Sequence, residues 1–293
     1  MSASAAHPEA LLLRAAELKD APVLGRICYE AFRTIAEGHN YPPDFPSPEI
    51  AAGLLGSFIS HPGFYSVVAE RDGVILGSNF LDERNPILGV GPITVTPEAQ
   101  NRQVGRRLME AVLKRSRDRN ALGTRLVQAG YHLRSLALYT KLGYDPRESL
   151  ACLQGTIPRS PIPKRSVRAA MESDLEECRK LCTQVLGFDR AGELKDAIRQ
   201  GSATVVETDG RISGYATAVA FFGHQVGESN LDIQALITAA PSIEGPGMLV
   251  PIRNAELLRW ALSSGLRITQ TMTLMSTGAY ADPQGAYVAS VFY

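Results

Sequence analysis

The chain has 293 residues, of which 45% are hydrophobic and 20% are charged, and its 30 basic side chains equal its 30 acidic side chains in number. This length favours two domains, and this composition is typical of globular proteins and excludes global disorder. Because the formal charge is zero, no long-range field draws the molecule to nucleic acid or to an anionic membrane, and we expect neither as a partner.

The cysteines and the apolar segments predict a cytoplasmic protein that binds no metal. Four cysteines are too few for a disulfide framework in a chain of this length, and Cys178 and Cys182 lack nearby third and fourth ligands for a metal ion. Residues 10–13 are apolar, but the charged segment that begins a signal peptide does not precede them. No run of about 18 apolar residues is present that could span a membrane.

The first half begins with a strand, two helices and a hairpin. Asp20 is an N-cap residue with Pro22 close behind it, so a helix begins there. Asp72-Gly73 is a hairpin turn, and glycines interrupt the strand that follows the hairpin. The expected strands are 12–16, 64–70, 74–81 and 86–96, and the expected helices are 20–36 and 48–60.

A cationic helix begins near Asn101, with apolar residues on one face and arginine and lysine over most of the rest. A strand at 124–129, a helix at 133–142 stopped by Gly143, and a strand near 150–153 complete the first half. The predicted order of elements is therefore β-α-α-β-β-β-α-β-α-β.

The second half repeats the first. Leu13-Arg14-Ala15-Ala16 recurs as Val167-Arg168-Ala169-Ala170, and the Asp72-Gly73 turn has a counterpart in Asp209-Gly210. Such self-similarity indicates a duplication. A segment rich in proline separates the copies and cannot continue a helix or a central strand. The predicted division is a first domain at 1–154, a linker at 155–164 and a second domain at 165–293.

The second copy diverges towards its end. We expect its third helix at 252–264, and we recognise no fourth helix before the closing strand near 286–292. In the segment 239–250, which we align with the loop before the cationic helix, Pro246 removes a donor and Glu244 would repel an anion. We therefore expect this copy to have lost the anion site of the first.

Residues 93–109 carry the most chemical information, because a strand turns there through polar residues directly into a helix. Such a turn directs unpaired backbone N–H groups and the positive end of the helix at one point, which suits a pyrophosphate. Arg102, Arg106 and Arg107 can add charge-assisted hydrogen bonds.

Two motifs resemble those of the GNAT family of acetyl-CoA-dependent N-acetyltransferases. Residues 100–105, Gln-Asn-Arg-Gln-Val-Gly, resemble its Gln/Arg-x-x-Gly-x-Gly/Ala signature, with Gln103 in place of the first glycine. Residues 132–144 resemble its later segment Asn-x-x-Ala-x-x-x-Tyr-x-x-x-Gly-Phe/Tyr. His132 and Ser135 replace the asparagine and the alanine, and Tyr139 matches the tyrosine. The element order over 12–153 also fits, and the tail looks like that of tandem GNAT-like proteins with a degenerate second domain.

This resemblance implies an α/β (α+β) chain of two tandem GNAT-like domains, each a mixed central sheet flanked by helices. It implies acetyl-CoA as co-substrate, no metal, and an amine acceptor that is a small molecule or a peptide. The two middle strands would separate after Val95, and pantetheine would lie between them. The implied CoA-binding residues are Thr94, Val95, Gln100, Arg102, Gln103, Val104, Gly105, Arg106, Ser135 and Tyr139.

The resemblance also implies the chemistry. The amine attacks the acetyl carbonyl directly, backbone N–H groups near Val95 polarise that carbonyl, and Tyr139 protonates the departing thiolate. An amine must lose a proton to react, and the candidate bases are Glu83, Asp82 and His132.

Other interpretations stay open on the sequence alone. Gly105 could serve helix packing, Tyr139 could be a packed aromatic and His132 a surface residue. A non-catalytic acyl-CoA-binding sensor and a scaffold without CoA are the rival functions. The sequence leaves open the acceptor, the base, the acyl-chain length and whether the chain forms a homodimer.

Overall fold

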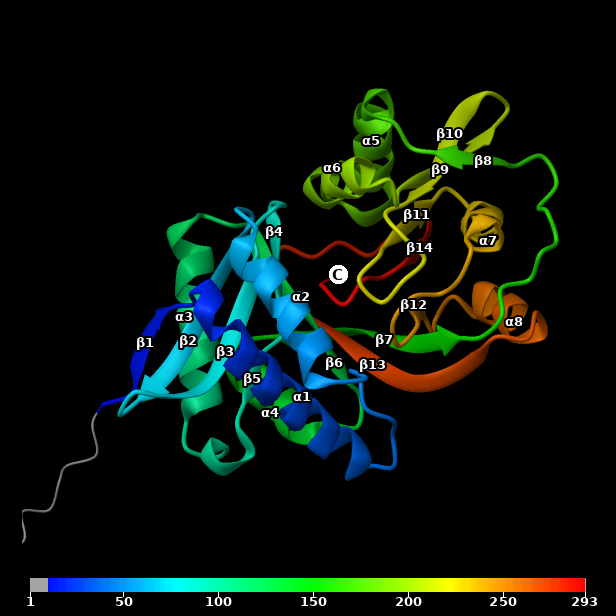
Figure 1. Cartoon of the computed structure of the whole chain (residues 1–293). Helices are drawn as coiled ribbons and strands as arrows, with labels where there is room; N and C mark the ends of the chain where they lie inside the picture. The colour runs from blue at the N-terminus through cyan, green and yellow to red at the C-terminus, as the bar shows by residue number, and fades with distance from the viewer. Residues whose placement is uncertain (1–9, 293) are drawn as a thin grey trace, which may run out of the picture. The chain divides into compact units, whose positions relative to one another are not determined.

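The computed structural model describes residues 10–292, which divide into two compact units (Figure 1). The first unit contains the residues up to Leu81 together with Val90–Asp118, and the second contains Asp82–Gly89 and the residues from Arg119 onward. The compact units thus divide the chain inside the first copy, whereas the sequence predicts a boundary in the linker at 155–164.

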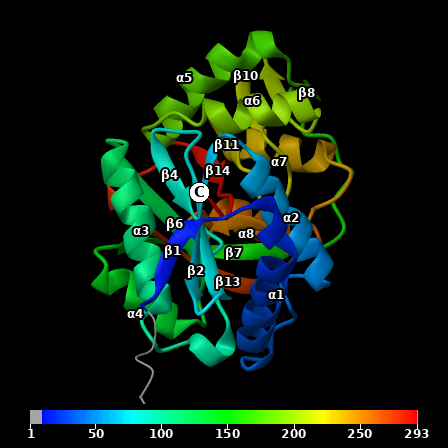
Figure 2. The same cartoon turned by 60° about the vertical axis from the view of Figure 1, so that its left-hand side comes forward.

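The first unit has a sheet between two layers of helices. Strands β1, β2 and β3 are neighbours in that order, and β5 pairs with β3. Helices α1 and α2 lie on one face of these strands and α3 lies on the other (Figure 2). The elements are β1 Leu12–Ala15, α1 Ala21–Glu37, α2 Pro48–Ser60, β2 Phe64–Arg71, β3 Val74–Asp82, β5 Thr94–Val95 and α3 Val104–Asp118, with short 3-10 turns at Leu18–Asp20 and Pro97–Ala99.

The second unit begins with strands and a helix of the first copy. These are β4 Ile87–Val90, β6 Gly123–Ala129, α4 Leu133–Lys141 and β7 Asp145–Gln154. The second copy contributes β8 Ser166–Ala169, a 3-10 turn at Glu172–Asp174, α5 Leu175–Leu186, α6 Ala191–Gln200, β9 Thr204–Thr208, β10 Arg211–Ala216, β11 Gln225–Gly227, α7 Asn230–Ala239, β12 Met248–Pro251, α8 Ala255–Ser263, β13 Arg267–Gly278 and β14 Ala286–Val288. The mixed α/β class is confirmed.

Alternation along β9 separates two hydrophobic cores in the second unit. Val205 belongs to a core that contains residues of α5 and α6, whereas Val206 belongs to a core that contains residues of α7 and α8. Successive side chains of a strand point to opposite faces of its sheet. The strand series β14-β11-β10-β9-β8 therefore has helices on both faces.

The two copies exchange strands. The neighbours in the second series of this unit are β4-β6-β13-β7-β12. Strand β13 of the second copy lies between β6 and β7 of the first, with Met272 opposite Ala129 and Thr271 opposite Ala151. Strand β7 in turn pairs with β12, with Cys152 opposite Leu249. Figure 1 shows β13 in orange beside β7 in green.

One ion-pair arrangement occurs in both copies and supports the predicted duplication. Arg14 donates to Glu70 at 2.8 Å and to Asp20 at 2.7 Å, and Asp20 also accepts from the backbone of Glu17 at 2.9 Å. The corresponding residues of the second copy, bonded in the same way, are Arg168, Glu207 and Asp174. Asp20 is buried, so the triad joins the first strand of its copy to the first helix and to the hairpin.

The two predicted hairpin turns also have the same backbone conformation. Asp72 and Gly73 have φ of 51° and 75°, and Asp209 and Gly210 have φ of 51° and 80°. Two successive residues with positive φ are the pattern of the tight turns that join twisted antiparallel strands. The sequence therefore predicted both turns correctly.

The predicted helices of the second copy need a correction. The helix expected at 252–264 is α8, which is the fourth helix of its copy by position, and α7 was missed. Residues 232–237 of α7 are all buried, and a helix that is apolar on most sides lacks the periodic pattern by which amphipathic helices are recognised. The counterpart of the loop before α3 is therefore the segment before α7, at 227–230, and not 239–250.

No helix within residues 10–292 has both the length and the hydropathy that crossing a membrane requires.

The triad around Asp20 predicts a pH-dependent stability. The Arg14 hydrogen bond holds the pKa of Asp20 below its usual range. A lowered pKa in the folded state stabilises above about pH 3.9, and this contribution is lost as the pH falls through the folded-state pKa. We expect Asp20→Asn to lower the free energy of unfolding by about 1–3 kcal/mol at neutral pH, and by less near pH 3.

Urea unfolding followed by circular dichroism measures this difference. Lys19→Ala is the control, because its ion pair with Glu17 is exposed and exposed pairs contribute little. An Asp20→Asn midpoint equal to that of the unmodified chain at neutral pH would contradict the assignment.

Candidate functional site

The loop before α3 has the left-handed backbone that its signature requires. Asn101 and Gln103 have φ of 64° and 63°. Glycine adopts this conformation freely, whereas other residues pay about 1–2 kcal/mol. Gln103 stands where the GNAT signature has glycine, so this chain keeps the loop conformation with a less suitable residue.

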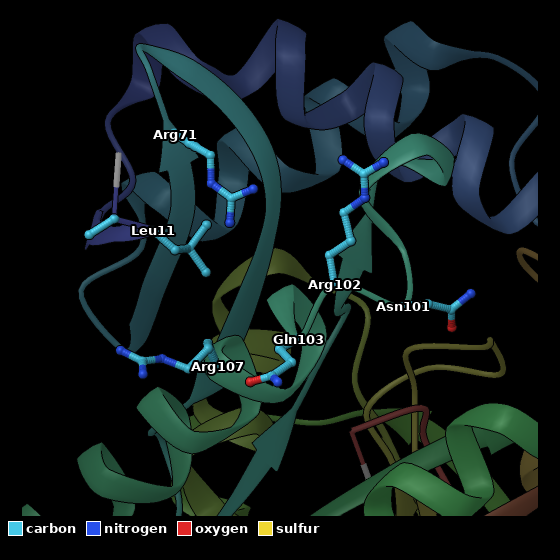
Figure 3. A pocket seen from close by; sticks show the side chains of 7 residues that line it. Leu11, Arg71, Asn101, Arg102, Gln103 and Arg107 are labelled. Atoms are coloured by element: carbon cyan, nitrogen blue, oxygen red, sulfur yellow. The ribbon is translucent and has the colours of Figure 1, made fainter. Parts of the chain in front are cut away.

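A cavity of about 400 Å³ opens beside this loop (Figure 3). Three arginines from different elements line it: Arg71 ends β2, Arg102 lies in the loop, and Arg107 lies in the first turn of α3. Among residues 10–292 no carboxylate forms an ion pair with any of them, and the Nε of Arg71 is buried without a hydrogen-bond partner. The remaining lining residues are Ala10, Leu11, Asn101 and Gln103.

The N-terminus of α3 adds to the positive charge that the three arginines bring to this cavity. The first turn of α3 contains no acidic residue, so nothing there compensates the positive end of the helix dipole. Arg71 and Arg102 also line a neighbouring cavity of about 270 Å³, which contains Glu98. Thr96 donates to Glu98, and this bond lowers the pKa of Glu98, so the second cavity places the carboxylates of Asp72 and Glu98 beside the two arginines. An anion is therefore expected in the first cavity.

The structure separates the predicted loop residues by role. Arg106 pairs with Glu110 at 3.5 Å and does not line the cavity, whereas Arg107, one residue further round the helix, does. Gln100 donates to the backbone of Val95 at 3.2 Å and so braces the loop. Val104, the first residue of α3, is buried, and Gly105 follows it in the same turn.

Two further expectations concern the strands. Thr94 and Val95 form β5, opposite Ser78 and Gly77 of β3. The parallel pairing of β4 with β6 ends at Gly89 opposite Arg125, so these strands separate before Val90 and not after Val95 as the resemblance implied.

Sequence reasoning missed Arg71 as a residue of the cavity. Its position beside a turn does not indicate that it lies near residue 102.

A second group of predicted residues lies on α4. Tyr139 is 6% exposed, and its ring packs edge-on against Tyr144 with 6.2 Å between ring centroids. Burial raises the pKa of Tyr139 to about 12, although a hydrogen bond from Ser135 opposes this shift. His132 is the N-cap residue of α4, and its Nδ1 lies 2.9 Å from the Ser135 hydroxyl oxygen.

The two carboxylates predicted as bases are engaged in ion pairs. Asp82 is buried and accepts from Arg84 with both oxygens, at 2.9 and 2.6 Å. Burial raises the pKa of Asp82. Glu83 lies 3.4 Å from Arg119 and its side chain is 6% exposed. Proton transfer to Glu83 stays a prediction.

In the second copy, the positions equivalent to this site are occupied by other side chains and by a strand. The backbone and side chain of Ser229 both donate to Asp232, which caps the N-terminus of α7. Strand β14 pairs with β11, and the backbone of Ala289 donates to Leu249 of β12 at 2.9 Å. In the second copy, the C-terminal segment therefore fills the position equivalent to the gap between the two middle strands of the first copy. At the α8 position that matches Tyr139 stands Ala261.

Within 10–292 no three side chains of histidine, cysteine, aspartate or glutamate are grouped as ligands. All four cysteines are buried free thiols.

The three arginines predict binding of a polyphosphate anion. Because each guanidinium offers charge-assisted hydrogen bonds at a partly exposed site, we expect Arg71→Ala, Arg102→Ala and Arg107→Ala each to weaken binding of inorganic pyrophosphate by about tenfold. Calorimetric titration measures this change, and added salt should reduce the affinity of the unmodified chain. Arg117→Ala, in the last turn of the same helix, should bind as the unmodified chain does. Equal losses in all four variants would indicate nonspecific attraction.

Comparison with known proteins identifies the domain. The model of the acetyltransferase (GNAT) family matches residues 28–144. No curated protein sequence gives a significant match. Among solved structures, a putative acetyltransferase from Pyrococcus horikoshii has a TM-score of 0.73 at 15% identity and covers 98% of this chain and 96% of its own. A GCN5-related N-acetyltransferase from Sphaerobacter thermophilus has a TM-score of 0.63 at 15% identity, over 95% of this chain and 99% of its own.

These two similarities show that the fold of nearly the whole chain occurs in other proteins. The family match confirms the resemblance drawn from residues 100–105 and 132–144. Residues 28–144 therefore carry an acetyltransferase domain that matches the GNAT family.

Proposed function

We propose that this chain transfers an acetyl group from acetyl-CoA to an amine, with one working site per chain contributed by the first copy. The observation that carries the proposal is the cavity with Arg71, Arg102 and Arg107 at the positive end of α3. Three guanidinium groups without carboxylate partners fit the pyrophosphate of CoA, whose charge they would neutralise.

Acetyl-CoA supplies an activated carbonyl and a thiol leaving group. The acceptor nitrogen attacks that carbonyl, the new C–N bond forms, and the C–S bond breaks with its electron pair left on sulfur. Tyr139 is the proposed donor of the proton that the thiolate takes up, since a buried phenol remains protonated at neutral pH. The proton that the nitrogen loses passes to a base, for which Glu83 and His132 are the candidates, or to water.

Three features support a single site. The α7 N-terminus is capped by Asp232, strand β14 lies between β11 and β12, and Ala261 stands at the position of Tyr139. Each removes one element of the proposed site: the anion position, the space between separated strands, and the proton donor. The second copy is therefore proposed to act through strand β13, which completes the sheet around α4.

The first prediction concerns binding. Calorimetric titration with acetyl-CoA should show about one site per chain, and Gly105→Glu, which places a carboxylate in the first turn of α3, should abolish it. Tyr139→Phe should bind as the unmodified chain does. Absence of binding by the unmodified chain would overturn the proposal, and two sites would overturn the role given to the second copy.

The second prediction concerns turnover. With a panel of small-molecule and peptide amines, the unmodified chain should release CoA and form the amide. Tyr139→Phe should lower kcat by about a hundredfold or more while KM for acetyl-CoA stays the same, because general acids contribute roughly 10²–10⁴ in rate. Binding without release of CoA for every amine would instead identify a sensor of acyl-CoA, the function that the ion-paired carboxylates Asp82 and Glu83 favour.

A further inference from the structure

The cavity beside α3 offers more positive charge than the pyrophosphate of CoA requires. Arg71, Arg102 and Arg107 line this cavity, and the N-terminus of α3 adds about half an elementary charge. A phosphate that is linked on two sides carries one negative charge, so the pyrophosphate of CoA carries about two. When pyrophosphate is bound, one of the three guanidinium groups therefore still lacks an anionic partner.

The cavity also has room for more than pyrophosphate. Its volume of about 400 Å³ lies within the range of roughly 300–1,000 Å³ that is typical of pockets enclosing a whole small ligand. Ala10 and Leu11 are apolar lining residues, which suit a sugar or a base better than a phosphate. The cavity therefore fits a phosphorylated nucleoside that is joined to pyrophosphate.

Arg71 differs in position from the other two arginines. Arg102 lies in the loop before α3 and Arg107 in the first turn of the helix, so both belong to the segment that directs N–H groups at a phosphate. Arg71 is instead the last residue of β2. Figure 3 shows its side chain entering the cavity from above, with Gln103 and Arg107 below it. Arg71 is therefore placed to bind a second anionic group.

The hairpin of β2 and β3 holds Arg71 ready for such a group. Asp72 and Gly73, which follow it, form the tight turn with φ of 51° and 75°, and β2 and β3 are neighbouring strands. Within residues 10–292 the Arg71 guanidinium forms no ion pair, and its Nε is buried without a hydrogen-bond partner. A partly buried charge without a partner carries a desolvation cost, which an anionic ligand offsets.

The second anionic group belongs in the first cavity and not in its neighbour. Arg71 and Arg102 also line the second cavity, but Asp72 and Glu98 lie there with them. These carboxylates repel a phosphate, and the lowered pKa of Glu98 keeps it charged at neutral pH. The described residues that line the first cavity include no carboxylate. The arginines therefore attract phosphate on the side of the first cavity.

We propose that Arg71 binds the 3′-phosphate on the ribose of CoA and makes the chain select CoA over donors that lack this group. This inference rests on the proposed function, because it assigns a further part of the same donor to the same cavity. The 3′-phosphate is a monoester and carries a charge of about −1.5 to −2 at neutral pH. Together with pyrophosphate it balances the three guanidinium groups and the helix N-terminus.

Calorimetric titration with acetyl-CoA and with acetyl-dephospho-CoA, which lacks only the 3′-phosphate, tests this assignment. We expect the unmodified chain to bind acetyl-CoA about tenfold more tightly, because the contact that is lost is a charge-assisted hydrogen bond. In Arg71→Ala this ratio should fall to about one. The affinity of this variant for acetyl-dephospho-CoA should equal that of the unmodified chain, which also shows that the variant is folded. Arg71→Lys should keep part of the ratio, because it keeps the charge.

Arg107→Ala is the matched control, because it removes an arginine from the same cavity. It should weaken the binding of both donors to the same extent and leave the ratio between them at about tenfold. Free inorganic pyrophosphate does not distinguish the two arginines. It has no ester link that fixes its position and can lie among all three guanidinium groups.

Three outcomes would overturn the assignment while leaving the proposed function intact. The first is equal affinity of the unmodified chain for the two donors. The second is a loss in Arg71→Ala that is the same for both donors, and the third is a ratio that falls in Arg107→Ala but not in Arg71→Ala. A chain that binds neither donor fails one step earlier, at the proposed function.

Discussion

Backbone pairing of strand β13 is the interaction on which the rest of the second unit depends. A strand edge exposes unpaired N–H and C=O groups, and these must find partners or remain a site for aggregation. Here β6 and β7 of the first copy do not pair with each other, because β13 of the second copy lies between them. Helix α4 connects β6 to β7, so the segment that carries Tyr139 is held by a strand encoded more than 120 residues later. The second copy thus contributes a strand to the sheet of the first.

The two copies kept the residues that fold them and diverged in those that would bind a ligand. The buried carboxylates Asp20 and Asp174 make the same contacts in each copy, because losing either would remove one of the two acidic partners of its arginine. The helix that follows the middle strands begins beside the arginines that line the cavity in one copy and with an aspartate cap in the other. One backbone therefore offers a positive helix end in the first copy and a neutralised one in the second.

Burial has two opposite consequences for the proposed chemistry. It keeps Tyr139 protonated until a thiolate is present, and it makes the same phenol a weak acid. For Asp82, by contrast, burial is compensated by Arg84, which ties the carboxylate to a structural role.

The sequence by itself determined the elements of the first copy, the hairpin turns at Asp72 and Asp209, the duplication and the two motifs that identify the family. These depend on local signals, such as capping residues, turn glycines and apolar periodicity, which act over a few residues. The tertiary structure alone decided the insertion of β13, the presence of Arg71 in the cavity, the ion pair of Glu83 and the buried helix α7. Each of these arises from contacts between residues far apart in the chain, and no local pattern encodes which distant strand or side chain will be the partner.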